Sequence, residues 1–444
     1  MRWPGRPVSA WSWNKETFYT KPLIQYMESV PDPRCCRVKK HVLAEILTCL
    51  VAGYVTGHTT LRRCLIWCRR HEKWLKKGLC LKNGIASVST VSRLLCRIDE
   101  ELFLFAFMEW IGEILDTKGI HLAIDGKAIR AAMHKTQGNG AKIPMLLHVL
   151  DTATGLVVAQ LPIKEKANEI TGIPELLKLL DIRGSIITID AIGTQTSIME
   201  QIIGQGGHFE LMVKRNQPIS YEEIVTQMSE LQTESKRKKA DPSYSLKYPD
   251  AMKQYEEYEI SEKNRDRYEY RSYQVCNDPE FVTRTKKEWS FVKSVGCVRQ
   301  TRILLVRDSE GNDITPDPET FRKEGTIRQP RPTSGDSSRD DIQVTGIISD
   351  MELTAKEMAE IKRSHWAVEN RLHHVLDDTF REDRSPAKGS KNNLALIRKF
   401  AYNLIRLAMI RLSLTCPVTE VMDLFSDDPA LLGRYLFNGI ASFY

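Results

Sequence analysis

The sequence lacks a long uninterrupted apolar segment. Its longest apolar run, LAEILTCLVAGYV at residues 43–55, contains Glu45 and is too short to cross a bilayer. The first fifteen residues, MRWPGRPVSAWSWNK, contain no apolar stretch of the kind that a secretory signal requires. We therefore expect no membrane role and no export.

Motifs for structural zinc and for nucleotide hydrolysis are also missing. The ten cysteines are scattered, and no pair of CxxC units occurs among them, so a structural zinc site has no support. We interpret them as reduced thiols of a cytoplasmic protein. No GxxxxGK[ST] run is present, so ATP-driven activity has no motif behind it. No repeat of fixed period occurs either.

What is present is the composition of a large folded protein. The chain has 444 residues, of which 42% are hydrophobic and 27% are charged, enough for two or three domains. The formal net charge of +7 is compatible with a nucleic-acid partner but does not establish one.

The first part of the chain, residues 1–116, reads as a helical domain. Apolar patterns of helical length occupy 41–55 and 101–115, and a capped helix is expected to begin at Ser87 or Ser89. Arg93 and Arg97 follow at a spacing that places them on one helical face. They either contact DNA or form an ordinary solvated surface, and the sequence leaves both open.

From residue 117 the pattern becomes mixed. Apolar, β-branched runs predict strands at 119–125, 145–151, 155–163, 185–193 and 208–216, with helices at 168–181 and 194–204. A turn signal, DTATG, joins the second and third strands into a hairpin. Residues 117–217 are thus expected to form the first part of an α/β domain built on a mixed sheet.

The remaining chain divides into an insertion and a second helical part. Residues 218–347 are charged and tyrosine-rich, and we interpret them as an insertion with β content and a mobile loop. Residues 348–444 are helical and complete the α/β domain. An apolar or aromatic stripe there recurs at helical spacing, on Met358, Ile361, His365, Val368, Leu372 and Val375.

Two predicted strands each end on an aspartate. Asp125 follows the strand formers 120–124, and Asp190 follows 185–189. A lone aspartate at a strand end is usually a turn residue, and Asp125 precedes a glycine as turn aspartates often do. Two such residues at the carboxyl ends of strands in one sheet indicate a ligand site. Carboxylates that approach one another repel unless a cation shares them, and hard divalent cations take oxygen ligands.

A third carboxylate is expected on the helix of the stripe. Glu369 follows Val368 by one residue, so it lies at the border of the buried face. Spacing alone does not exclude the acids downstream, and a surface role is the ordinary alternative for any glutamate. The nearby histidines are expected to pack or to form hydrogen bonds. The competing acids are Asp377, Asp378, Glu382 and Asp383.

Several blocks resemble the H-repeat-associated family of bacterial insertion-sequence DDE transposases. They occur in the family's order: VPDPRCCRVKKHVLAEIL, AIDGKAIR, KEKANEITGIPELL, ITIDAIGTQ, VKRNQP and RSHWAVENRLHHVLDDTFRED. The resemblance covers residues from about 20 to 412. It implies an RNase H-like core interrupted by an insertion, with the family's three metal-binding carboxylates at Asp125, Asp190 and Glu369.

The resemblance also implies a chemistry and a set of partners. Two Mg²⁺ ions, with Mn²⁺ as substitute, would serve an enzyme that cuts transposon ends and joins 3′ ends to target DNA. The expected partners are double-stranded DNA and a second copy of the chain on that DNA, in the bacterial cytoplasm at the nucleoid. An RNase H-like nuclease or resolvase that cuts without joining, and a domesticated DNA-binding protein without catalysis, are the alternatives.

Basic residues near the predicted site and in the outer domains are candidates for phosphate contact. For any one of them, a solubilising surface charge is an equally good interpretation. The DNA sequence recognised and the cleavage pathway cannot be predicted. The candidate DNA contacts are Lys127, Arg130, Lys214, Arg215, Lys236, Arg237, Lys238, Lys239, Arg93, Arg97 and His365.

Overall fold

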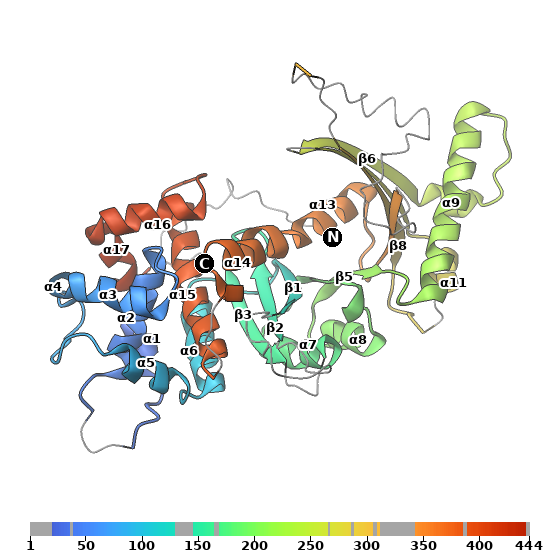
Figure 1. Ribbon diagram of the computed structural model, residues 1–444. Coiled ribbons are helices and arrows are strands. Elements are labelled where there is room, and N and C mark those ends of the chain that lie inside the picture. The colour runs from blue at the N-terminus through green and yellow to red at the C-terminus, as the bar shows by residue number, and fades with distance from the viewer. Residues whose placement is uncertain are drawn as a thin grey trace, which may run out of the picture. The chain divides into compact units, whose positions relative to one another are not determined.

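The computed structural model describes residues 20–35, 39–128, 145–163, 168–264, 267–285, 288–304, 309–310, 342–384 and 389–440. The chain forms two compact units. One is built from two segments that are distant in the sequence, and the other from the continuous segment between them. Unit 1 comprises residues 1–185 and 364–444, and unit 2 comprises residues 186–363. Figure 1 labels many of the helices and strands.

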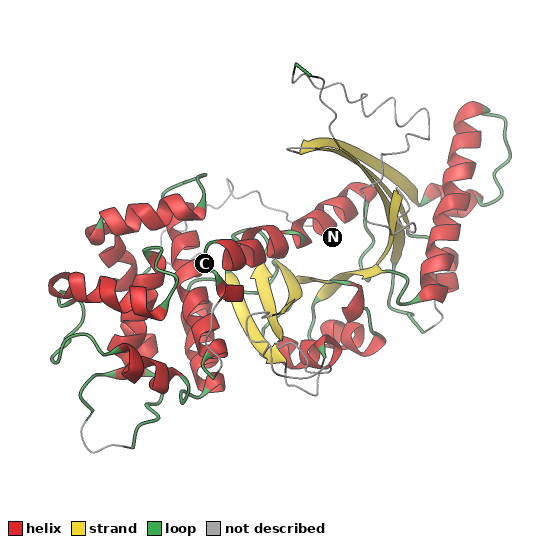
Figure 2. Ribbon diagram, in the orientation of Figure 1, coloured by secondary structure: helices red, strands yellow, loops and turns green. Residues whose placement is uncertain are grey.

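Unit 1 contains three strands and many helices (Figure 2). Its strands are β1 (His121–Ala128), β2 (Met145–Asp151) and β3 (Val157–Ile163), paired antiparallel in the order β3-β2-β1. The predicted hairpin of the second and third strands is confirmed. The helices before and after β1 are α1 (Leu23–Glu28), α2 (Leu43–Val55), α3 (Leu61–Arg70), α4 (Glu72–Leu75), α5 (Val88–Leu95), α6 (Glu100–Gly112) and α7 (Glu169–Leu177).

The end of the chain returns to unit 1 and supplies its central helix. The elements there are η4 (Val368–His373), α14 (His374–Asp378), η5 (Glu382–Arg384), α15 (Lys391–Arg411), α16 (Val418–Asp427) and α17 (Pro429–Leu436). Helix α15 packs on α2 and α6 because apolar residues recur all round it, and the Phe400 ring lies 4.9–5.9 Å from three aromatic rings of α6. The side chain of Asn403 also bonds both backbone groups of Val157, at 2.9 and 2.8 Å, so α15 covers the outer strand β3.

Unit 2 contains a mixed sheet in the order β4-β5-β9-β8-β7-β6. Strands β4 (Ile186–Ile189) and β5 (His208–Val213) are parallel, and β9 (Ile342–Ser349), β8 (Ser294–Leu304), β7 (Arg267–Cys276) and β6 (Tyr255–Asn264) continue antiparallel. The predicted β content of the insertion is confirmed. The helical elements are η3 (Ala191–Gly193), α8 (Thr196–Gly204), α9 (Pro218–Ala240), α10 (Pro249–Lys253), α11 (Pro279–Thr285) and α13 (Ala355–His365).

The sequence analysis missed the longest helix of unit 2. Helix α9 begins with Pro218 in its first turn, a position that favours helix starts, and runs to Ala240. Its apolar residues are sparse, so its periodicity is weak, although Ile224, Met228 and Leu231 are buried at helical spacing. None of the helices that the structure describes is long and apolar enough to cross a membrane.

Candidate metal centre

Asp125 lies inside strand β1 and does not end it. The strand continues through Gly126, Lys127 and Ala128, so the predicted end of the strand at Asp125, and with it the turn interpretation, is wrong. Asp125 pairs in register with His148 of β2, so both side chains stand on the same face of the sheet. The carboxylate is tolerated in the strand because it is 26% exposed and has an imidazole partner, His373.

Glu369 lies on a π-helical turn, η4, that interrupts the predicted helix. A π turn inserts one extra residue, so positions after it are displaced around the axis relative to an α-helix. The predicted stripe holds through Leu372, but the next buried apolar residue is Leu376, and Val375 is only half-buried. The prediction of Val375 in the stripe is therefore wrong, because at about 100° per residue Leu376 lies closer than Val375 to the middle of the stripe.

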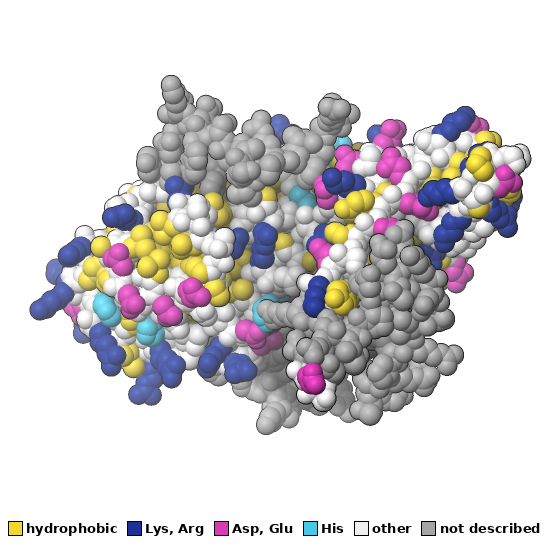
Figure 3. Space-filling view, turned by 90° about the horizontal axis from the view of Figure 1, so that it is seen from above, with side chains coloured by type: hydrophobic (Ala, Val, Ile, Leu, Met, Phe, Trp, Pro, Cys, Tyr) yellow, Lys and Arg dark blue, Asp and Glu magenta, His cyan; other side chains and the backbone are white. Residues whose placement is uncertain are grey.

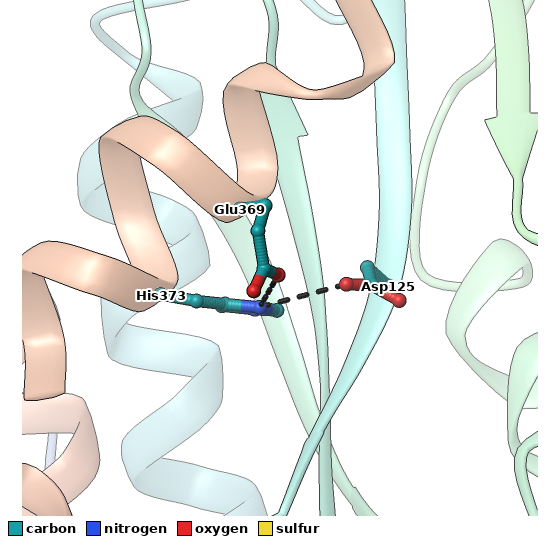
Figure 4. Close-up of side chains that lie close together, drawn as sticks. All are labelled: Asp125, Glu369 and His373. Atoms are coloured by element: carbon teal, nitrogen blue, oxygen red, sulfur yellow. Dashed lines mark hydrogen bonds and ion pairs between the residues drawn. The ribbon is translucent and has the colours of Figure 1, made fainter. Parts of the chain in front are cut away.

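His373 brings Asp125 and Glu369 together. Its Nδ1 atom lies 3.2 Å from Glu369 Oε2 and 3.5 Å from Asp125 Oδ2 (Figure 4). One ligand atom from each of the three residues falls within 4.8 Å of the others, a grouping that fits a metal ion. Glu369 and His373 come from η4 and Asp125 comes from β1, so this group joins two segments far apart in the sequence.

A second histidine lies behind the first. His148 Nδ1 is 3.1 Å from His373 Nε2, a hydrogen bond in which one imidazole donates and the other accepts. Both rings are buried. Burial, and then the charges of Lys399, His373 and Lys127, hold the pKa of His148 well below its usual value. His148 is therefore a neutral ring at neutral pH.

The hydrogen bond from His373 also affects Glu369. It lowers the pKa of the Glu369 carboxyl, against a smaller opposing effect of burial. The Glu369 side chain is 61% exposed, so its carboxylate is open to solvent on one side and held by His373 on the other. An ionised carboxylate beside a second carboxylate and an imidazole nitrogen is a suitable donor set for a divalent cation.

Lys127 pairs with three of the four acids that compete with Glu369. Its ammonium lies 2.5 Å from Asp377 and 3.5 Å from Asp383, and it is also 3.3 Å from Glu382. The Lys127 side chain is 5% exposed. Burial lowers the pKa of Lys127, but the three carboxylates outweigh burial and raise it. The phosphate contact predicted for Lys127 would need these ion pairs to open, and it stays a prediction.

Glu382 has two further cationic partners, and the fourth competing acid, Asp378, pairs with a histidine. Glu382 is 1% exposed and lies 3.1 Å from Lys399 and 3.6 Å from Arg398, both on α15. Although burial raises its pKa, these cations, Lys399 first, lower the pKa of Glu382 to about 2. Asp378 is 65% exposed and pairs with His374 at 3.0 Å. The structure groups Glu369, and none of its four competitors, with Asp125.

Asp190 belongs to unit 2, where it follows β4 as predicted. It precedes the short helix η3, and its side chain makes no capping bond to that helix. Its carboxylate lies 2.6 Å from the ammonium of Lys214, the residue after the parallel strand β5. Both side chains are about half exposed. Its approach to Asp125, which is in the other unit, stays a prediction.

The basic residues predicted to contact DNA are exposed in several places. Arg93 lies on α5, which begins after Ser87, the cap residue that bonds Thr90, and Arg97 lies just beyond that helix. Arg215 is exposed next to Lys214, and residues 236–239 are exposed at the end of α9. On the face shown in Figure 3, Lys and Arg side chains are interspersed with Asp and Glu side chains.

Two further predicted DNA contacts are His365 and Arg130. His365 is 7% exposed, so its burial does not favour the contact predicted for it, which stays a prediction. Arg130 lies outside the residues that the structure describes.

The sequence analysis missed the two histidines as site residues. The signal for His373 was its position four residues after Glu369, which places the two side chains side by side on a helix. No signal identified His148, because its pairing with Asp125 depends on strand register. Glu169, at the start of α7, also lies over β1, where a Cβ added to Gly126 would collide with its carboxyl group.

Comparison with known families identifies the class of this protein. The Transposase DDE domain model matches residues 116–404, and the model described as DDE_Tnp_1-associated matches residues 24–111. The chain belongs to the DDE transposase family. The predicted fold class, an α/β protein with a mixed sheet and an RNase H-like core, is confirmed.

Two curated relatives and one solved structure are similar to this chain. The "H repeat-associated putative transposase YhhI" of Escherichia coli (strain K12) is 30% identical over 373 residues, which cover 82% of this chain and 84% of that one. The "Uncharacterized protein in dhlA 3'region" of Xanthobacter autotrophicus is 33% identical over 286 residues, 63% of this chain and 88% of that one. A solved piggyBac transposase synaptic complex with hairpin DNA is similar with a TM-score of 0.43 at 9% identity, over 94% of this chain and 79% of that one.

Proposed function

We propose that this protein cuts DNA at the ends of a mobile element and joins the freed 3′ ends to target DNA. Asp125, Asp190 and Glu369 supply the carboxylates for two divalent ions, Mg²⁺ or, as a substitute, Mn²⁺. The observation that carries the proposal is the grouping of Asp125 and Glu369 within one possible coordination sphere. Membership of the DDE transposase family supports it.

The residues present fit such a metal site. The donor set contains carboxylate oxygens, which hard divalent ions prefer. Asp125 is fixed because it and the residues before and after it pair with strand β2. When bound, two such ions stabilise the charge on the attacking and leaving oxygens of an in-line phosphoryl displacement. Water as the attacking group breaks a DNA strand, and a freed 3′ hydroxyl as the attacking group joins one.

The chain's own side chains have distinct parts in this proposal. Strand β1 and the turn η4 hold Asp125 and Glu369 in place, and without the ion the hydrogen bond from His373 keeps the Glu369 carboxylate ionised and oriented. Lys214 balances the charge of Asp190. Arg215 and the exposed basic residues at the end of α9 contact phosphates, which positions the DNA without reading its sequence.

A joining assay tests the proposal. The full chain is incubated with a linear duplex carrying the DNA on either side of its own gene and with a supercoiled plasmid as target. Cut 3′ ends and joined products are expected with Mg²⁺ or Mn²⁺ and not with EDTA. The Asp125→Asn variant should form neither, whereas Asp378→Asn, which changes an exposed acid paired with His374, should match the wild type.

Other outcomes of the same assay would overturn parts of the proposal. Cutting without joining would make the protein a nuclease or resolvase. DNA binding without cutting would make it a DNA-binding protein without catalysis. We also propose that two copies act together on DNA, at the nucleoid in the bacterial cytoplasm, and the mass of the protein–DNA complex tests that stoichiometry.

A further inference from the structure

We infer that His373 is a nitrogen ligand of the ion that Asp125 and Glu369 hold, and that His148 orients it. This inference rests on the proposed function. It concerns which metal the site prefers and which residues set that preference, because an imidazole in the donor set changes the chemistry from purely oxygen ligation.

The distances support direct ligation. Ligand atoms that share one ion at about 2.1 Å lie roughly 3 Å from one another when their bonds are at right angles. His373 Nδ1 is 3.2 Å from Glu369 Oε2 and 3.5 Å from Asp125 Oδ2. The nitrogen is therefore placed as a third ligand atom would be, and Figure 4 shows it directed at both carboxylates.

The surroundings of His373 fix the ring in that orientation. Its side chain is 6% exposed, so it has little freedom to rotate away. Its other nitrogen, Nε2, bonds His148 Nδ1 at 3.1 Å. A histidine that binds a metal almost always has its second nitrogen held in this way, because the second bond sets both the tautomer and the ring plane.

His148 is suited to either tautomer of its partner. Its Nδ1 donates to His373 Nε2 when His373 carries its proton on Nδ1, and it accepts when that proton lies on Nε2. The remaining atom, His148 Nε2, is buried without a hydrogen-bond partner among the described residues, so it can carry or release the compensating proton. His373 Nδ1 can thus present a lone pair without moving either ring.

A hydrogen bond alone is the competing role for His373. In that role the ring only donates a proton to Glu369, and asparagine would replace it, because its amide nitrogen occupies a similar position and also donates. Asparagine lacks an imidazole nitrogen to bind a metal. Mn²⁺ accepts imidazole ligands more readily than Mg²⁺ does, so only the ligand role predicts a preference for Mn²⁺.

Metal binding by the full chain without DNA distinguishes the two roles. The metal-free protein is titrated with Mn²⁺ and with Mg²⁺ by calorimetry, and the Mn²⁺ form is examined by pulsed electron paramagnetic resonance for a coupled nitrogen. We expect tighter binding of Mn²⁺ and a nitrogen signal. In His373→Asn, Mn²⁺ affinity should fall about tenfold or more, Mg²⁺ affinity much less, and the nitrogen signal should vanish.

Matched variants define the controls. His374→Asn changes the adjacent histidine, which is 70% exposed and pairs with Asp378, and should bind Mn²⁺ as the wild type does. His148→Phe should weaken Mn²⁺ binding roughly 10- to 100-fold, the usual effect of losing the partner of a metal-binding histidine. Thermal unfolding of each metal-free variant verifies folding, and the shift in midpoint on adding Mn²⁺ is an independent readout of affinity.

The outcomes separate the inference from the proposed function. If Asp125→Asn abolishes Mn²⁺ binding but folded His373→Asn keeps both the nitrogen signal and the preference for Mn²⁺, the inference is overturned and the carboxylate site stands. If Asp125→Asn and Glu369→Gln both bind Mn²⁺ like the wild type, the carboxylate site itself is wrong.

Discussion

The ammonium of Lys127 lies 2.5 Å from the carboxylate of Asp377, which ties strand β1 to helix α14. Strand β1 carries Asp125, and α14 directly follows the turn that carries Glu369. This ion pair therefore connects the two segments whose carboxylates meet at the candidate metal centre. The same pair gives Asp377, one of the acids that compete with Glu369, a cationic partner on β1.

The first prediction concerns stability. Lys127→Met should lower the free energy of unfolding by about 3 kcal/mol, because it removes the buried cation that pairs with Asp377, Glu382 and Asp383. Urea unfolding at pH 7 measures this. The control is Lys178→Met, which removes an exposed pair with Glu175 and should cost under about 1 kcal/mol. Equal effects of the two variants would show that Lys127 does not tie the elements together.

A second prediction concerns pH. The pKa of Glu382 is lowered from 4.5 to about 2, so its ion pairs stabilise the fold above about pH 4.5 and this contribution is lost as the pH falls towards 2. Glu382→Gln should be about 3 kcal/mol less stable than the wild type at pH 7, because Lys399 and Arg398 lose their buried partner.

The difference between wild type and Glu382→Gln should narrow as the pH falls from about 4.5 towards 2, and urea unfolding at a series of pH values measures it. Glu175→Gln, a change at an exposed pair, should show almost no difference at any pH. A gap for Glu382→Gln that stays constant down to pH 2.5 would contradict this explanation.

The third prediction concerns the last buried position of the stripe. Leu376 is fully buried and Val375 is half-buried. Leu376→Ala should cost about 2–5 kcal/mol in the free energy of unfolding, and Val375→Ala under about 1 kcal/mol. Urea unfolding measures both losses, and a loss for Val375→Ala as large as that for Leu376→Ala would contradict this packing.

DNA binding provides a fourth prediction. Lys236 and Lys239 are exposed at the end of α9, so replacing both by alanine should weaken DNA binding and reduce the slope of log affinity against log salt by about 2. The matched control, Lys253→Ala with Lys293→Ala, also removes two exposed lysines of unit 2. Identical salt slopes for the two double variants would remove α9 from the DNA surface.

Much of the fold was predictable because the spacing of apolar residues and the residues that form turns and helix caps are visible in short stretches of sequence. The alternating and apolar runs that became β1 to β5 were recognisable, and Ser87 caps its helix as one of the two expected serines. Helix α9 was missed because its charged sequence carries little periodicity. The domain boundaries expected from the sequence stay predictions, although the structure divides the chain at other points.

The candidate site was predictable only in part. Asp125 was recognised because a carboxylate is unusual after a run of strand-forming residues. Strand β1 nevertheless continues beyond Asp125 because it pairs with β2, and local sequence does not reveal strand pairing. The π turn, which buries His373 beside Leu372, has no periodic signature in the sequence. His148 became visible only through the register of β1 and β2.

The most direct test of the central claim compares Glu369→Gln with Asp377→Asn in metal-dependent DNA cleavage. Both changes keep the size of the side chain and remove one charge. Glu369→Gln should remain folded and bind DNA, yet cleave slower by orders of magnitude, because a metal site that loses one carboxylate loses several kcal/mol of transition-state stabilisation. Asp377→Asn should still cleave, since Lys127 retains Glu382 and Asp383. Normal cleavage by Glu369→Gln, together with an inactive but folded Asp377→Asn, would contradict the account.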